Sequence, residues 1–160
     1  MNHVVKRSRI PFHGAGVLPA YQRPDGTWEV LLFRRAIHPD RGSWSVLGGR
    51  MEQGETPAEA ALREAAEEAF SSRDPRTFLD RLTNALPPAF DIASCRVRRV
   101  FVPGIFSYHT FLVPLTSRVP PESFRPDAYE CDGYDWFPAA ALPPQSHREV
   151  VATVRYFHLR

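Results

Sequence analysis

The alternation of hydrophobic and polar positions predicts paired strands in the first third of the chain. Residues 13–21 form one predicted strand, and residues 28–34 alternate in the manner of a second. The turn signal Pro24-Asp25-Gly26 lies between them, so the two segments are predicted to pair. A loop over residues 37–42 and a short strand over residues 45–47 are expected to follow.

Helical signals begin at Thr56. Thr56 and Glu59 have the spacing of a capping box, and Pro57 suits the first helical position. The following residues are rich in alanine, the strongest helix former. Within them Leu62 and Ala69 belong to a narrow apolar stripe suited to packing against a sheet. A helix starting at Pro57 is therefore predicted.

The remainder of the chain predicts two further helices and three strands. A short helix after Asp74-Pro75 is indicated by apolar residues at helical spacing, and Pro87-Pro88 ends it. The predicted strands are residues 96–101 and 107–115, which form a hairpin, and residues 134–137. A terminal helix over residues 146–157 is predicted, with Ser146 and Glu149 as its capping box and Val150, Val154 and Phe157 on its buried face. This order implies an α/β fold with a mixed sheet between helices.

Composition fits one domain in a reducing compartment. With 160 residues, 43% of them hydrophobic, the chain can bury a sizeable core. We predict a basic N-terminal extension over residues 1–12, which lacks the apolar core of a signal peptide, and a single domain over residues 13–160. Two cysteines do not make a disulfide framework, and no apolar run is long enough to cross a membrane. A cytoplasmic protein without membrane association is expected.

Three carboxylates in the first predicted helix carry the chemistry. Glu64, Glu67 and Glu68 lie at positions i, i+3 and i+4, so they share one helix face. Like charges this close require a cation among them, and Mg²⁺ prefers oxygen ligands. The alternative is a solvated acidic face, which is common in helices. Gly49, Glu55 and Arg63 at fixed offsets favour the metal site, because Arg63 can both orient the carboxylates and offset their charge.

These positions together resemble a known motif, the Nudix box, G-x5-E-x7-R-E-U-x-E-E-x-G-U, in which U is a bulky aliphatic residue. The segments around the box are similar to the family's as well: Gly42-Ser43-Trp44 precedes it, and Glu130, Trp136-Phe137 and Leu142-Pro143 follow it. The resemblance covers roughly residues 13 to 157. It implies a Nudix-type α/β/α sandwich.

The chain departs from the box at its end. Phe70 stands where the family has glycine, Ser71 and Ala65 stand at the aliphatic positions, and Leu47 replaces a proline. A glycine there would suit a left-handed helix cap, which phenylalanine does not adopt cheaply. We therefore expect the helix to continue through Phe70 to Ser71 or Ser72. None of these departures removes a metal-binding oxygen.

The resemblance also implies roles for individual residues. The metal ligands would be the Gly49 carbonyl, Glu64, Glu67 and Glu68, with Glu64 as a candidate base. Arg63 would hold Glu64, and Glu55 would brace the loop by accepting backbone N–H bonds. Glu130 is the candidate for a more distant metal ligand, and its alternative role is an exposed loop glutamate. The implied cofactor is Mg²⁺, with Mn²⁺ as the alternative.

Candidate substrate contacts come from three further segments. Arg34 and Arg35 end a strand that resembles one lining the family's cleft, and alternation turns only one of them inward. The alternative for either is a surface arginine. Arg50, next to Gly49, could also reach a phosphate. A strand further along the chain offers aromatic candidates for stacking on a base, and their alternative is the core; they are Tyr108, His109 and Phe111.

The predicted function is a metal-dependent pyrophosphohydrolase that cleaves a diphosphate linkage in a nucleotide or nucleoside diphosphate derivative. The alternatives are a nucleotide-binding or sensing domain without turnover and an RNA 5′-pyrophosphohydrolase. A net charge of only +2 does not indicate the broad basic surface that RNA would require, and no DNA partner is expected. The expected partner is a small-molecule nucleotide, bound by a monomer or a homodimer.

Overall fold

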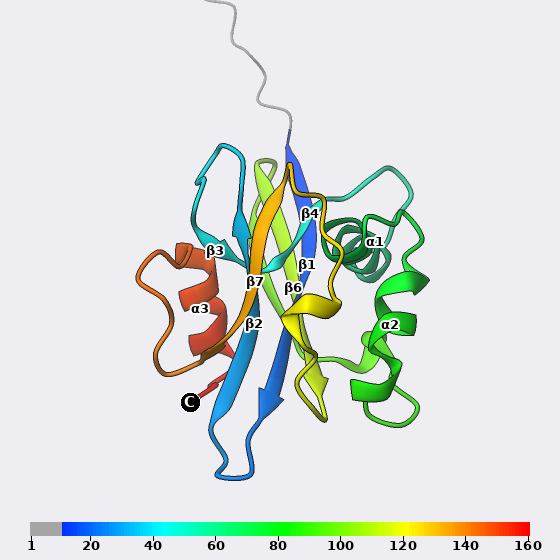
Figure 1. Cartoon of the computed structure of the whole chain (residues 1–160). Coiled ribbons are helices and arrows are strands. Elements are labelled where there is room, and N and C mark those ends of the chain that lie inside the picture. Colours follow the sequence, from blue (N-terminus) through cyan, green and yellow to red (C-terminus); the bar gives the residue numbers. More distant parts are fainter. Residues whose placement is uncertain (1–10) are drawn as a thin grey trace, which may run out of the picture.

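One mixed β-sheet with helices on both faces organises residues 11–160, the part of the chain that the computed structural model describes (Figure 1). The N-terminal extension predicted over residues 1–12 therefore lies mostly outside the described residues. The strands are β1 (Phe12–Gln22), β2 (Trp28–Arg35), β3 (Trp44–Ser45), β4 (Leu47–Arg50), β5 (Val97–Val102), β6 (Phe106–Leu115) and β7 (Cys131–Pro138). The helices are α1 (Pro57–Phe70), α2 (Arg76–Leu82) and α3 (Arg148–Tyr156), with 3₁₀ turns at Thr83–Ala85, Ile92–Ser94 and Pro121–Ser123.

The sheet opens between β2 and β4, and this opening positions the site. Strands run in the order β3-β2-β1-β6-β5, while β4 also pairs with β1 and β7 with β2. The pairing of β1 with β6 is parallel and the other pairings are antiparallel. The two ends of β1 have different partners: residues 14–17 pair with β4, and residues 20–22 pair with β2. The predicted mixed sheet and both predicted hairpins are confirmed.

Each face of the sheet has its own hydrophobic core, so the fold is an α/β/α sandwich. Helices α1 and α2 cover one face, where Val17, Leu31 and Val113 pack against the alanines of α1 (Figure 1). Helix α3 covers the other face, where Leu18 and Leu112 pack against the residues predicted for its buried side. Alternation along β1 and β6 sends neighbouring residues to opposite cores.

Helix α1 begins as predicted and ends at Phe70, the family's glycine position, one residue short of the expected end at Ser71 or Ser72. Thr56 accepts a hydrogen bond from the Glu59 amide at 3.2 Å, and Glu59 accepts one from the Thr56 amide at 2.8 Å. Phe70 keeps helical geometry, and Ser71 takes the left-handed conformation at φ 54°. The ring of Phe70 packs 5.4 Å from that of Phe124. Phe70 therefore anchors the end of the helix, and the left-handed cap moves to the next residue.

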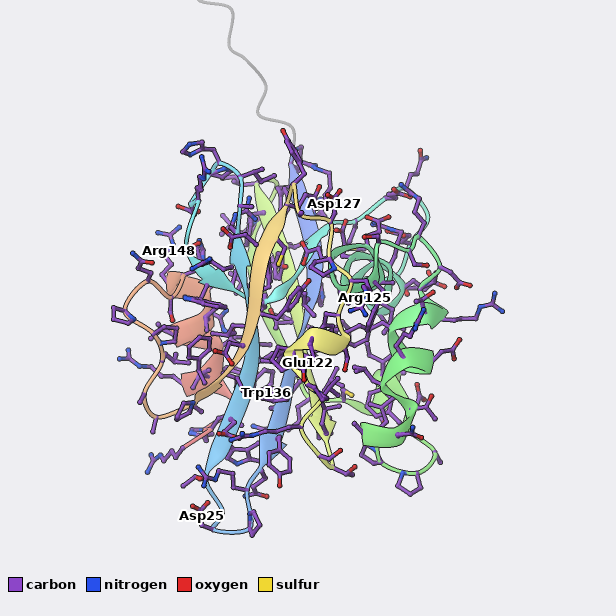
Figure 2. All side chains as sticks on the ribbon, in the orientation of Figure 1. Asp25, Glu122, Arg125, Asp127, Trp136 and Arg148 are labelled. Carbon is purple, nitrogen blue, oxygen red and sulfur yellow. The ribbon has the colours of Figure 1, made fainter. Side chains whose placement is uncertain are left out.

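The proline-rich segment before β7 packs against the C-terminal end of α1. In this segment the Arg125 amide donates to the Ala69 carbonyl at 2.7 Å (Figure 2). Ser71 Oγ donates to the Arg125 carbonyl at 3.0 Å. These bonds hold the segment that leads to Glu130 close to the helix that carries the carboxylates.

The predicted cap of the terminal helix is wrong. Helix α3 begins at Arg148 with His147 as its N-cap, and His147 Nδ1 accepts the hydrogen bond from the Glu149 amide at 3.2 Å. Ser146 Oγ donates to the Pro143 carbonyl instead, at 2.7 Å. The tight turn at Pro143 uses the serine hydroxyl, which leaves the carboxylate of Glu149 available for another contact.

The packing predicts that Phe78→Ala destabilises the protein. Phe78 is fully buried between α1 and α2, so its removal leaves a cavity and should lower the free energy of unfolding by about 3–5 kcal/mol. Urea denaturation would measure this change. The control is Phe101→Ala, because Phe101 is 68% exposed and its loss should cost about 0.5 kcal/mol or less. Equal effects of the two changes would contradict this core assignment.

Candidate active site

A buried guanidinium is the centre of the site. Arg63, only 6% exposed, donates from Nε and Nη2 to the two carboxylate oxygens of Glu55 at 2.5 and 3.0 Å. Nη1 reaches Glu64 at 2.9 Å and Glu67 at 3.4 Å, and Nη2 also donates to the Arg50 carbonyl at 2.9 Å. One side chain thus ties the loop before α1 to the carboxylates on α1.

Glu55 braces that loop from the other side. Its Oε2 accepts a hydrogen bond from the Glu52 amide at 2.7 Å, which is the backbone contact expected of it. The hydrogen bonds from Arg63 keep the pKa of Glu55 below its usual value. The hydrogen bonds to Glu55 and to Glu64 raise the pKa of Arg63. Both groups are therefore charged at neutral pH, where they form an ion pair.

The carboxylates on α1 lie in a desolvated, like-charged environment. Burial raises the pKa of Glu64, Arg63 opposes this, and the charges of Glu67 and Glu130 raise the pKa further. Burial, with the charge of Glu64, also raises the pKa of Glu68 well above its usual value. Repulsion of this kind is relieved by a cation bound among the oxygens.

Two glycines of β4 allow the carboxylates to approach the sheet. A Cβ atom at position 49 would lie 2.5 Å from Glu64 Oε2, so only glycine leaves room for that carboxylate. The Gly48 amide donates to Glu68 Oε2 at 3.1 Å. Tyr134 on β7 donates to the Glu68 carbonyl at 2.5 Å. Gly49 and the carboxylates of Glu64 and Glu68 therefore come together as the sequence suggested.

The donor set fits a hard divalent cation. Oε1 of Glu67 is buried and accepts no hydrogen bond, with Arg73 Nη1 at 3.5 Å, and carboxylate and carbonyl oxygens are the ligands such cations prefer. Among residues 11–160, no three His, Cys, Asp or Glu side chains already have a metal-binding arrangement. Arg63 itself donates hydrogen bonds to Glu64 and Glu67. Glu130 is close enough for its charge to act on both Glu64 and Glu68.

A cavity of about 420 Å³ adjoins the two glycines. It lies between the sheet and α3, and its lining combines aromatic rings with polar side chains. The aromatic lining is Phe12, Phe33, Phe106 and Tyr108, and the polar lining includes Arg35, Arg50, Thr110, Glu149 and Thr153. A site that has carboxylates at one end and aromatic rings along its floor suits a molecule with a phosphate chain and a planar ring.

Of the two neighbouring candidate arginines on β2, only one faces the cavity, as the alternation of side chains along a strand requires. Arg35 lines the cavity, and its Nε donates to the Pro39 carbonyl at 2.8 Å. Arg34 forms an ion pair with Asp132 at 2.6 Å and does not line the cavity. Arg50 also lines the cavity, with its guanidinium 4.6 Å from the Phe12 ring centroid. Arg35 and Arg50 are therefore the two of these three that could meet a phosphate.

Of the three aromatic candidates on β6, only one lines the cavity. Tyr108 lines the cavity, whereas Phe111 is buried in the core under α1 and His109 lines no part of the cavity. Odd and even positions of β6 face opposite sides of the sheet. The structure does not bring His109 and Phe111 to the cleft in which they were expected.

Several lining residues were not found from the sequence. Phe12 and Phe106 begin their strands opposite each other in the parallel register, with ring centroids 5.7 Å apart. Glu149 was assigned to a helix cap, yet its carboxylate accepts a hydrogen bond from Arg98 at 2.9 Å. The aromatic residues at the start of the predicted strands were a sequence signal that could have identified Phe12 and Phe106. Nothing in the sequence pairs Arg98 with Glu149, because they are far apart along the chain.

Comparison with a family model identifies the chain. A NUDIX domain model matches residues 12–156. The chain belongs to the Nudix family. Within residues 11–160, no helix of this Nudix domain has the length and apolar character needed to span a bilayer.

Curated relatives match shorter segments. A protein of Mycobacterium tuberculosis named as an 8-oxo-dGTP diphosphatase is 42% identical over 76 residues, which cover 44% of this Nudix chain and 35% of that protein. The human 8-oxo-dGDP phosphatase NUDT18 is 51% identical over 51 residues, 32% of this chain and 16% of that protein. The matches thus span about a third or less of the length of these relatives.

Solved structures agree on the fold. A Nudix hydrolase from Nitrosomonas europaea has a TM-score of 0.60 at 26% identity, covering 94% of this chain and 72% of that chain. An Ap4A hydrolase from C. elegans has a TM-score of 0.63 at 19% identity, covering 92% of this chain and 95% of that chain. The second likeness concerns the fold alone, and both support the predicted Nudix α/β/α sandwich.

The site geometry predicts that Arg63→Gln lowers the stability of the protein. The change removes both hydrogen bonds to Glu55 and leaves buried carboxylates unpaired, so the free energy of unfolding should fall by about 3 kcal/mol. Thermal denaturation would measure this effect.

The matched control is Arg73→Gln. Arg73 also reaches Glu52 and Glu67, at 2.7 and 3.5 Å, but its side chain is 72% exposed. Solvent screens such a pair, so this change should leave the melting temperature unchanged. If Arg73→Gln were as damaging as Arg63→Gln, the central role of the buried guanidinium would be refuted.

Proposed function

We propose that this chain is a divalent-metal-dependent pyrophosphohydrolase that cleaves a phosphoric anhydride bond in a nucleotide or nucleoside diphosphate derivative. The observation that carries the proposal is the junction at Gly48 and Gly49. On one side lie the crowded carboxylates of α1, and on the other lies the cavity with aromatic and basic lining. A nucleotide has a matching division between its phosphate chain and its base.

The residues proposed to hold the metal are the Gly49 carbonyl, Glu64, Glu67 and Glu68, with Glu130 as a more distant ligand. The proposed ion is Mg²⁺, with Mn²⁺ as the alternative. When bound, such an ion supplies Lewis-acid contact with phosphate and lowers the pKa of water. Arg63 orients Glu64, which serves as the candidate base for the attacking water. Glu55 holds Arg63 in place and therefore affects the reaction only by positioning Arg63.

The phosphate chain is proposed to lie between the carboxylates and the basic residues of the cavity. Arg35 and Arg50 both line the cavity beside Gly49, so either could neutralise phosphate oxygens that the metal does not reach. Arg34 is assigned a structural role in its ion pair with Asp132. The nucleoside would occupy the cavity under α3. The names of the curated relatives make 8-oxo-dGTP and 8-oxo-dGDP the first substrates to test.

The proposal predicts metal-dependent release of phosphate or pyrophosphate. The panel would include 8-oxo-dGTP, 8-oxo-dGDP, unmodified nucleoside triphosphates, ADP-ribose, dinucleoside polyphosphates and 5′-triphosphate RNA, with Mg²⁺ or Mn²⁺. Glu67→Gln should lower turnover roughly a thousandfold, equivalent to about 4 kcal/mol of lost transition-state stabilisation. A chelator should abolish turnover, and added Mg²⁺ should restore it.

The control is Glu122→Gln, because Glu122 is an exposed residue of the 3₁₀ turn Pro121–Ser123 and does not line the cavity (Figure 2). It should retain full activity. Binding of a panel member without turnover would replace the proposal with the alternative of a nucleotide-binding domain. Turnover of 5′-triphosphate RNA in preference to the small nucleotides would instead favour the RNA pyrophosphohydrolase.

A further inference from the structure

The hairpin of β5 and β6 carries a cluster of exposed apolar side chains. Phe101 is 68% exposed, Ile105 55% and Val102 42%, and all of them lie at the turn that joins the two strands. Among residues 11–160, the other large hydrophobic side chains that are this exposed are Tyr129 and Tyr156, which belong to separate segments. Apolar side chains gathered at one place indicate a surface that another molecule covers.

Strand β5 is also a free edge of the sheet. It pairs with β6 alone, in an antiparallel register that runs without a shift from Val97 to Val102. The Leu112 amide donates to the Arg96 carbonyl at 2.9 Å, so the backbone groups of the even-numbered residues of β5 face β6 and those of the odd-numbered residues face outward. Within the part of the chain that the structure describes, no backbone hydrogen bond reaches these outward groups. They form a template on which another strand can pair.

This edge lacks the features that usually prevent pairing. Natural edge strands carry proline, lysine or a bulge, and residues 97–102 contain none of these. Strand β7, which pairs with β2 alone, carries Asp132 and Asp135 and ends at Pro138. On β5, Arg98 is engaged with Glu149 of α3. Of the two outer strands, β5 is therefore the one open to pairing.

The order of residues on β5 suits a second copy of the same strand. In a symmetric antiparallel pair, the register is defined by the residue that faces its own copy. If Arg98 or Arg99 faces itself, like charges meet, which is destabilising. If Phe101 faces itself, Arg99 lies opposite Pro103, which has no N–H to donate. The register in which Val100 faces itself avoids both faults.

The Val100 register is also complementary in charge and shape. It places Arg99 of each copy opposite Phe101 of the other, where the two residues exchange both of their outward backbone hydrogen bonds. Their side chains are exposed and lie on the same face of the sheet. A guanidinium is attracted to the face of an aromatic ring. The most exposed ring of the hairpin thus gains a cationic partner.

We propose that β5 is a dimerisation edge, which pairs antiparallel with β5 of a second copy of this chain with Val100 at the two-fold axis. The contact is one pair of short strands, which is small for a protein complex, so the dimer is weak and forms only as the protein concentration rises. Phe101 is therefore exposed at the dilution of a denaturation measurement. The inference does not depend on the proposed function.

Sedimentation equilibrium would test the association at protein concentrations from about 1 μM to 1 mM. The wild-type protein should form dimers at the upper end of this range. Phe101→Lys should weaken the dimer about tenfold, because it sets like charges opposite each other and the symmetric dimer contains the pair twice. The double variant Arg99→Glu/Phe101→Lys sets opposite charges at the same positions and should restore the association to within about threefold.

The matched control is Tyr129→Lys. It makes the same change of charge at an aromatic residue that is 74% exposed but lies away from the hairpin, so the dimer should be unaffected. Melting temperatures would confirm that each variant is folded. Glu67→Gln should also associate like the wild-type protein, which separates this test from the test of the proposed activity.

Amide hydrogen exchange would test the edge itself. The amides of Arg99 and Phe101 face outward, so their exchange should slow as the protein concentration rises. The amide of Val100 faces β6 and should exchange at an unchanged rate.

Three results would overturn the inference. The first is a wild-type protein that stays monomeric throughout the concentration range, and the second is a dimer that Phe101→Lys leaves intact. The third is a double variant that stays as weak as Phe101→Lys, because the register requires Arg99 to face Phe101. Restored association in the double variant, with slowed exchange at Arg99 and Phe101, would establish the β5 edge as the interface.

Discussion

The buried guanidinium of Arg63 is the interaction on which the candidate site depends. A charge this deeply buried is costly unless it is fully paired, and Arg63 is paired with Glu55, Glu64 and Glu67. Its bond to the Arg50 carbonyl adds the end of β4 to the same network. The loop before α1, the end of β4 and the carboxylates of α1 therefore have a common anchor. Displacing the guanidinium would affect all of them together.

The opening of the sheet places the carboxylates that Arg63 holds next to the cavity. Because β1 changes partner from β4 to β2, the glycines of β4 lie beside α1 on one face and beside the cavity on the other. Small residues serve both sides: Gly49 makes room for the Glu64 carboxylate, and Gly48 makes room for the Tyr108 hydroxyl. The same short strand thus separates the carboxylates from the aromatic floor while keeping them in contact.

Much of the fold could be predicted because its signals are local. The capping box of α1, the β1–β2 turn and the proline stop after the second helical segment each lie within a few residues of the element they define. The continuation of α1 through Phe70 was also predictable, since it follows from the backbone cost of a left-handed phenylalanine. The cap of α3 was not, because the Ser146 hydroxyl could either accept a hydrogen bond from the Glu149 amide or donate one to the Pro143 carbonyl, and the turn at Pro143 decided between them.

The sequence by itself determined the family, the helix that presents the carboxylates, and the spacing that aligns Arg63 with them. These depend on helical periodicity, which is a property of neighbouring residues. Only the tertiary structure decided which side of β6 faces the cavity, and hence that Tyr108 lies there while Phe111 is in the core. It also joined Arg98 to Glu149 and brought Tyr108 over the glycines of two other strands. Such contacts join distant segments, and strand register, which local sequence specifies weakly, decides which residues meet.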